Sequence, residues 1–502
     1  MGQGGVFLTK KSPIFFSAIL LTGVNLVLRL ISTSFQVYIS AKIGAAGVGL
    51  LQLVLSVGSM ALIAGIAGIR TATMYLTAGE LGIRKPENVH HVLSGCVLYS
   101  ILCSGTVALI LYFGAPIIAD KWIANDQSAN AIRLYACFLP VCCLSGVMVG
   151  YFTAANRIGT LAAVEIAEQF VSMVITMAML SLWAKNDPGK ACQTVICGSG
   201  LGACVTLTLL TLLRIREKAP KGSAFPLRKK LLDTAVPLAL ADDLKAGINT
   251  VENLMVPKRL ALYTAITDPL AVFGTVCGMV FPVLMFPAAI VFSLAELLIP
   301  EMARCHAAGS RKRIEYLSKR SLRIVLLYSS LFSGLMFLLA QPLCMRLYSN
   351  ADAGRYLALY APLAPMLYCD AIIDAMNKGL GQQKICVRYN IFTAALDVTF
   401  LFLLLPRYGM EGYFFSFLIT HLINFILSLR LLIKTAGIRL NYRVSFFTLL
   451  CTLLSTFGAS LLPSPLLGCC AYLLLLGSLL TLFRILSRED IQWIKGLIRP
   501  GA

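Results

Sequence analysis

The sequence predicts an all-α polytopic membrane protein with about fourteen transmembrane helices. Of its 502 residues, 58% are hydrophobic and only 13% are charged, and the mean hydropathy is +0.81. Soluble domains contain about twice that share of charged residues. The apolar blocks are much longer than the strands of a membrane barrel and lack period-two alternation, so strands are not expected.

The apolar blocks recur from one end of the chain to the other, and each is long enough to cross a bilayer. The first block follows Lys10 and Lys11 and continues through Arg29 to Tyr38, so we expect a retained spanning helix rather than a cleaved signal. We expect spans at residues 13–38, 47–69, 91–113, 132–152, 161–183, 191–213, 233–256, 270–299, 321–343, 356–377, 385–405, 412–433, 444–462 and 465–486.

The basic residues predict how these spans are oriented. With the N-terminus in the cytoplasm, about three quarters of the 43 Lys and Arg residues fall in cytoplasmic segments, which is the positive-inside pattern. We therefore expect both termini in the cytoplasm. The formal charge of +20 does not indicate nucleic-acid binding, because the chain has no solvated basic domain. The basic loops at 228–230 and 311–313 could bind anionic membrane lipids.

The chain repeats itself at an offset of about 225 residues, which indicates two related lobes. The segment "RLYACFLP" at 133–140 resembles "ALYAPLAP" at 358–365, and two weaker pairs occur earlier in each half, in the same order. We expect two six-helix lobes related by an axis along the membrane normal, plus two extra C-terminal helices. The predicted parts are an N-terminal lobe at 1–213, a basic cytoplasmic linker at 214–232, a C-terminal lobe at 233–433, and the extra helices with a cytoplasmic tail at 434–502.

The seventh span carries four ionisable side chains. Asp242, Lys245, Glu252 and two asparagines share one helical face, and Asp243 lies about a quarter turn away. Four central charges cost on the order of 10 kcal/mol, which exceeds the roughly 5 kcal/mol that the apolar remainder of the helix returns. The stripe must therefore face protein or water. It is either a polar network that seals the lobes together or the wall of a water-filled cavity between helices 1 and 7.

The first span has a polar stripe of its own, from Thr22 through Arg29 to Gln36. Arg29 could bind a phosphate group with two hydrogen bonds, or pair with Asp242 or Glu252 across the lobe interface. The candidate substrate-binding residues are Arg29, Asn25, Gln36, Lys245, Asn249, Glu252 and Asn253. The candidates for a coupling cation, H⁺ or Na⁺, are Asp242, Asp243 and, in helix 10, Asp374.

The sequence contains no pattern typical of an enzyme. A phosphate-binding loop of the G-x-x-x-x-G-K-[ST] type is absent, and "GSGLGA" at 198–203 lies inside a span, where small residues serve helix packing. The 16 cysteines are scattered through apolar stretches without C-x-x-C pairs, which is typical of small buried hydrophobes. We expect no catalytic residue, no bound metal and no cofactor.

The segment "KIGAAGVGLLQLVLSVGSMALIAGIAGIRTATMYLTAGELG" at 42–82 resembles the start of the stage V sporulation protein B family. The matching residues are Gly44, Gly47, Gly49, Leu50 and Gln52, followed by the turn Gly68-Ile69, whereas Leu51 replaces the usual tyrosine. That family belongs to the polysaccharide branch of the multidrug/oligosaccharidyl-lipid/polysaccharide (MOP) superfamily, alongside the lipid II flippases.

The resemblance implies a flippase of the bacterial cell membrane with lobes like those of MATE transporters and lipid II flippases. Its substrate would be a polyprenyl-pyrophosphate-linked glycan, such as a peptidoglycan or polysaccharide precursor for the spore cortex, moved by alternating access. Relatives carry a cationic residue in helix 1, where Arg29 stands in this chain. Asp242, Asp243 and Glu252 depart from the more cationic cavity of lipid II flippases. Two alternatives remain: a cation-coupled multidrug exporter of the MATE type, and a scaffold for envelope-building enzymes.

Overall fold

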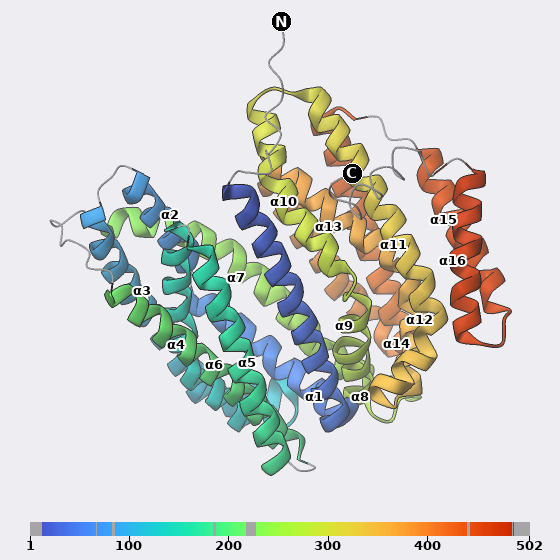
Figure 1. Ribbon diagram of the computed structural model, residues 1–502. Helices are drawn as coiled ribbons and strands as arrows, with labels where there is room; N and C mark the ends of the chain where they lie inside the picture. The colour runs from blue at the N-terminus through green and yellow to red at the C-terminus, as the bar shows by residue number, and fades with distance from the viewer. Residues whose placement is uncertain are drawn as a thin grey trace, which may run out of the picture. The chain divides into compact units, whose positions relative to one another are not determined.

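Every element that the structure describes is a helix (Figure 1). The computed structural model describes residues 13–66, 68–82, 86–155, 157–183, 187–216, 227–438, 442–483 and 485. Within these ranges there is no strand, as expected for a chain whose long apolar blocks must satisfy their own backbone hydrogen bonds inside a bilayer.

The chain divides into two compact units. The first comprises Met1–Gly278 and Ala394–Tyr413, and the second comprises Met279–Thr393 and Phe414–Ala502. Helices of the first unit are α1 (Pro13–Ile66), α2 (Ile69–Gly82), α3 (Pro86–Ile117), η1 (Ile118–Ile123), α4 (Ser128–Ala154), α5 (Ile158–Leu182), α6 (Pro188–Arg216), α7 (Leu227–Leu260) and α8 (Pro269–Gly274). The π-helix η2 (Thr275–Val280) leads from the first unit into the second.

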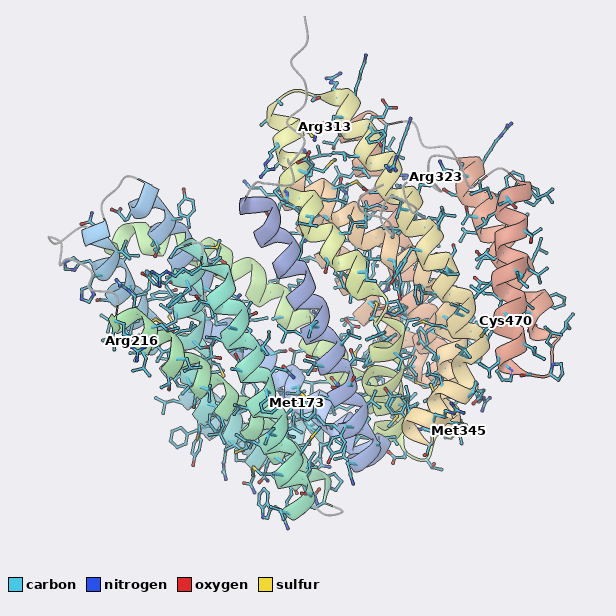
Figure 2. The ribbon with its side chains drawn as sticks, in the orientation of Figure 1. Met173, Arg216, Arg313, Arg323, Met345 and Cys470 are labelled. Carbon is cyan, nitrogen blue, oxygen red and sulfur yellow. The ribbon has the colours of Figure 1, made fainter. Side chains whose placement is uncertain are left out.

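The second unit continues the chain with shorter elements before its long helices. These are α9 (Phe281–Leu284), α10 (Ala288–Ala307), α11 (Arg311–Tyr348), α12 (Ala351–Tyr360), η3 (Ala361–Leu363), α13 (Ala364–Gly379), the outer parts of α14 (Gln383–Ala436), α15 (Tyr442–Ser460) and α16 (Pro465–Leu482). Figure 2 shows Arg313 and Arg323 toward one end of α11 and Met345 toward the other.

Two helices are too long for one passage through a bilayer. α1 and α14 each contain 54 residues, and at about 1.5 Å per residue each is more than twice as long as the hydrocarbon core is thick. Both break at a glycine with left-handed backbone angles, Gly44 (φ 71°) and Gly409 (φ 56°). Gly44 belongs to the run Gly44, Gly47 and Gly49, which we call the glycine motif. Its conformation is one that L-residues with a side chain rarely adopt. Each long helix is therefore two spans joined at a glycine, as predicted for spans 1 and 2 and for spans 11 and 12.

The number of passages agrees with the predicted number. Among the described residues, ten helices are long and apolar enough to cross a membrane, and an eleventh passage is the pair α8–α9 and α10, which bends by 65°. Counting α1 and α14 as two spans each, and adding α7, gives the fourteen expected passages. α7 carries more charged residues than the other spans, but its 34 residues are long enough to cross. The predicted all-α polytopic fold is confirmed.

The predicted division of the chain rests on the sequence repeat and stays a prediction. Its parts are 1–213, 214–232, 233–433 and 434–502. Part of the predicted linker, 217–226, lies outside the described residues. The two units overlap this division without matching it, because α7 and residues 394–413 pack within the first unit.

The glycine motif has a packing role in the first unit. A Cβ atom at Gly49 would collide with the carbonyl oxygen of Leu270, and one at Gly274 would collide with the backbone of Ala45 and Gly49. The second half of α1 and the start of α8 therefore touch backbone to backbone, which only glycine permits.

In the second unit the extra helices α15 and α16 pack against α11. The ring of Tyr472 fills the space beside Gly334, and its hydroxyl donates a hydrogen bond to the carbonyl of Ser330 over 2.7 Å. Tyr472 is fully buried although it lies in a helix of mostly exposed leucines. One buried tyrosine thus anchors the predicted extra pair to the core of this unit.

We predict that Gly49→Ala destabilises the protein by about 1–3 kcal/mol, because the added methyl group must push two backbones apart. The matched control is Gly105→Ala in α3, where a Cβ meets nothing within 4 Å. Thermal unfolding in detergent measures both variants. Equal melting temperatures for the two variants would contradict the close contact of α1 and α8.

Candidate functional site

The carboxyl groups of Glu252 and Asp397 lie within hydrogen-bonding range of each other inside the first unit. Glu252 is on α7, and Asp397, only 6% exposed, is on the first half of α14. Glu252 is eight residues before the end of α7, roughly 12 Å along the helix, which is close to the middle of a bilayer core. Two ionised carboxylates in contact at this depth repel strongly, so the pair requires a shared proton or a cation.

The π-helix η2 adjoins this pair and offers polar groups of its own. The carbonyl of Gly278 accepts hydrogen bonds from the Gln36 amide and the Ser40 hydroxyl of α1, each over 3.4 Å. The Cys277 thiol is 3.9 Å from the Tyr413 hydroxyl and lies close enough to Glu252 to interact electrostatically. Short π-helices are frequent at functional sites because they free backbone groups from the regular ladder.

We call the six residues Gln36, Ser40, Glu252, Cys277, Asp397 and Tyr413 the carboxylate cluster. They come from α1, α7, η2 and α14 and belong entirely to the first unit. The cluster offers carboxylate, amide and hydroxyl oxygens, which are groups that hold protons and hard monovalent cations.

The predicted polar stripe of α7 divides between two environments. Toward the helix end, the Asn253 amide donates to the Ser56 hydroxyl over 3.0 Å, and the Thr250 hydroxyl lies 3.1 Å from the Ser56 carbonyl. These contacts join α7 to the second half of α1, so Asn253 belongs to a structural polar network. Lys245 and Asn249 are exposed instead. The described part of the stripe is therefore packed at Asn253 and exposed at Lys245 and Asn249, and the water-filled cavity between helices 1 and 7 stays a prediction.

Other predicted site residues lie elsewhere or cannot be placed. The side chains of Arg29, Asn25 and Asp242 lie outside the described residues, although the backbones belong to α1 and α7. Asp243 is partly buried and acts electrostatically on Tyr99 of α3.

Asp374 already has a cationic partner in the second unit. Its carboxylate pairs with the Lys378 ammonium 2.6 Å away, one turn along α13. Two hydrogen bonds join other polar groups of this unit. The Asn424 amide donates to the Asp370 carboxylate over 2.9 Å, and the Asn377 amide donates to the Ser428 carbonyl over 2.9 Å.

The predicted set omits Asp397, Ser56 and Tyr413. Asp397 has a detectable signal, because it is the one carboxylate in the predicted span 385–405. Ser56 and Tyr413 carry no such signal, since serine and tyrosine are ordinary residues in membrane helices. Among the described residues, no group of three or more His, Cys, Asp or Glu side chains is arranged to hold a metal ion.

Comparison with known proteins agrees with this architecture. A family model described as MatE matches residues 268–403. Stage V sporulation protein B of Bacillus subtilis (strain 168) is 20% identical over 418 residues, which is 80% of each chain. The chain is thus similar to stage V sporulation protein B over most of its length.

Solved structures show the same fold. A lipid II flippase MurJ in an inward closed conformation matches with a TM-score of 0.70 at 13% identity, covering 96% of this chain and all of that one. A multidrug resistance MATE family transporter of the MOP superfamily, in an inward-facing conformation, matches with a TM-score of 0.69 at 12% identity over 84% of this chain and 98% of that one. The chain is therefore a multi-pass membrane protein with the fold of these transporters.

We predict that Asn253→Ala and Ser56→Ala couple in a double-mutant cycle, with an interaction energy of about 0.6–1.7 kcal/mol, because each removes one half of the same interhelical hydrogen bond. Unfolding free energies in detergent give the value. Asn253→Ala combined with Ser94→Ala, an exposed serine on α3, is the control and should be additive. Additivity of the first pair would show that the hydrogen bond between α7 and α1 contributes nothing.

Proposed function

We propose that the protein is a flippase that carries a polyprenyl-pyrophosphate-linked glycan across the bacterial cell membrane by alternating access. The observation that carries the proposal is the exposed Lys245–Asn249 face in the middle of a spanning helix. Such groups are too costly to face lipid, and a headgroup made of sugars and phosphates needs polar partners at this depth. The fold shared with a lipid II flippase supports the same substrate class, and the similarity to stage V sporulation protein B is consistent with a role in the cell envelope.

The cationic side chains would bind the pyrophosphate. A lysine binds phosphate as a point charge, whereas an arginine can form two parallel hydrogen bonds with it. We assign this role to Lys245 and Arg29. Asn249 lies one turn from Lys245 and can donate to and accept from sugar hydroxyl groups.

The carboxylate cluster would couple the cycle to a cation gradient. A proton or a sodium ion between Glu252 and Asp397 would remove the repulsion of the two carboxylates and hold α7 against α14. Release of the cation would restore the repulsion and favour separation of the two helices. This makes the pair the element through which a gradient could bias two conformations.

The same pair favours the second candidate function, a cation-coupled multidrug exporter of the MATE type. That function needs a cation site but no phosphate-binding cations. The two functions therefore differ in the roles of Arg29 and Lys245, and not in the role of the carboxylate cluster.

Headgroup accessibility in proteoliposomes tests the proposed function. The vesicles contain a fluorescent polyprenyl-pyrophosphate glycan, and an external quencher reports headgroups that arrive from the inner leaflet. We expect exposure that depends on the protein. Folded protein that gives no exposure under any imposed ion gradient, but expels cationic drugs, would favour the exporter.

We predict that Arg29→Ala lowers the initial flipping rate by about 10-fold or more, which corresponds to the loss of one charge-assisted hydrogen-bonded contact. Arg29→Lys should retain part of the rate. The control is Arg355→Ala on α12, an exposed arginine paired with Asp352. Unchanged flipping in an Arg29→Ala protein that inserts normally would exclude Arg29 from the substrate site.

We predict that Glu252→Gln and Asp397→Asn each abolish the dependence of transport on an ion gradient, because an amide replaces one of the two charges that require a cation. Transport rates at equal and at unequal Na⁺ or H⁺ concentrations measure this dependence. Glu411→Gln, at an exposed position of α14, should keep it. If both cluster variants kept the full gradient dependence, the coupling site would lie elsewhere.

A further inference from the structure

The first unit contains a cavity of about 490 Å³ near the C-terminal end of α7. Its walls are mainly apolar and come from α1, η1, α7 and the middle part of α14. The wall residues that matter here are Met60, Trp122, Leu254, Met255 and Phe402. We call this cavity, together with the two cationic residues Lys258 and Arg259 that complete its lining, the α7-end pocket.

The two cations have contacts that hold them at the pocket. The Lys258 ammonium donates a hydrogen bond to the carbonyl of Lys121 in η1. The Arg259 guanidinium lies over the ring of Phe402, with its central carbon 3.2 Å from the ring centroid. Among the described residues, neither cation forms an ion pair with a carboxylate.

These cations are exceptions to the charge pattern of the chain. Lys121, Lys258 and Arg259 belong to the minority of basic residues on the side that the charge bias assigns to the outside. They come from two separate segments, yet η1 and the end of α7 bring them together. Cations in the last turn of a helix also favour its dipole, but that role requires neither an apolar cavity nor an aromatic ring beneath the guanidinium.

Each cation retains capacity to bind an anion. Lysine has three N–H donors, of which the Lys121 carbonyl uses one. An arginine stacked on an aromatic face still has its N–H groups directed outward in the guanidinium plane. The pocket thus combines two cations with an apolar cavity, which matches the charge and the polarity of a phosphate ester joined to a hydrocarbon chain.

We propose that the α7-end pocket binds an anionic phospholipid of the leaflet in which α7 ends. The phosphate contacts Lys258 and Arg259, and one acyl chain enters the cavity beside Leu254 and Met255. A cavity of about 490 Å³ suits one acyl chain. It is too small for a polyprenyl chain, which is several times as long as an acyl chain. The site is distinct from the carboxylate cluster and does not rest on the proposed function.

Thermal unfolding of the purified, delipidated protein tests this proposal. We expect phosphatidylglycerol to raise the melting temperature more than phosphatidylcholine does. In the Lys258→Gln/Arg259→Gln variant, the phosphatidylglycerol concentration needed for half of that shift should rise on the order of 10-fold or more. The control Lys190→Gln/Arg355→Gln removes two cations from the same predicted side and should respond like the unchanged protein.

A second variant separates the acyl chain from the phosphate. Met255→Trp fills the cavity and keeps both cations, so it should lose the shift if a chain occupies the pocket. Glycerol phosphate alone should give no shift. The proposal is overturned if the Lys258→Gln/Arg259→Gln variant responds to phosphatidylglycerol like the unchanged protein, if glycerol phosphate stabilises as strongly, or if only a polyprenyl phosphate stabilises.

Discussion

The cost of placing charge in a bilayer determines where α7 can lie. Its four ionisable side chains would cost on the order of 10 kcal/mol if they faced hydrocarbon. In the described part of α7, Glu252 lies beside Asp397, where a shared proton or a cation is needed to offset the repulsion, and Asn253 bonds to Ser56. Lys245 and Asn249 are exposed. The first unit is therefore organised around α7, with α1, η2 and the middle part of α14 as its polar partners.

The same constraint applies to the π-helix η2, which lies beside α7. Non-helical backbone within a membrane is tolerated only where protein or water satisfies its polar groups. The π-helix η2 meets this condition, since Gln36 and Ser40 donate to its Gly278 carbonyl. The crossing of α1 and α8 at Gly49 and Gly274 brings these donors close enough to reach η2. The glycine motif and the polar residues thus serve one purpose, which is to assemble a polar site from helices that are otherwise apolar.

The fold was predictable from the sequence because bilayer thickness and charge bias act on every span in the same way. The site was less predictable. The α7 stripe could be read from spacing alone, but its division between packed Asn253 and exposed Asn249 depends on the position of α1. The pairing of Glu252 with Asp397 joins residues far apart in the sequence, and no local pattern encodes it. Asp374 has the residue type of an ion site, yet its nearest charge is Lys378 on its own helix.

Water accessibility of the exposed α7 face tests the central claim most directly. A membrane-impermeant charged maleimide is applied to proteoliposomes containing Asn249→Cys, and mass spectrometry distinguishes the new cysteine from the native ones. Leu474→Cys is the control, because Leu474 on α16 is 72% exposed in an apolar helix and should face lipid. The account predicts labelling at position 249 and none at position 474. An Asn249→Cys protein that stays unlabelled, with the reagent on either side and under every ion gradient, would show that this face is sealed from water.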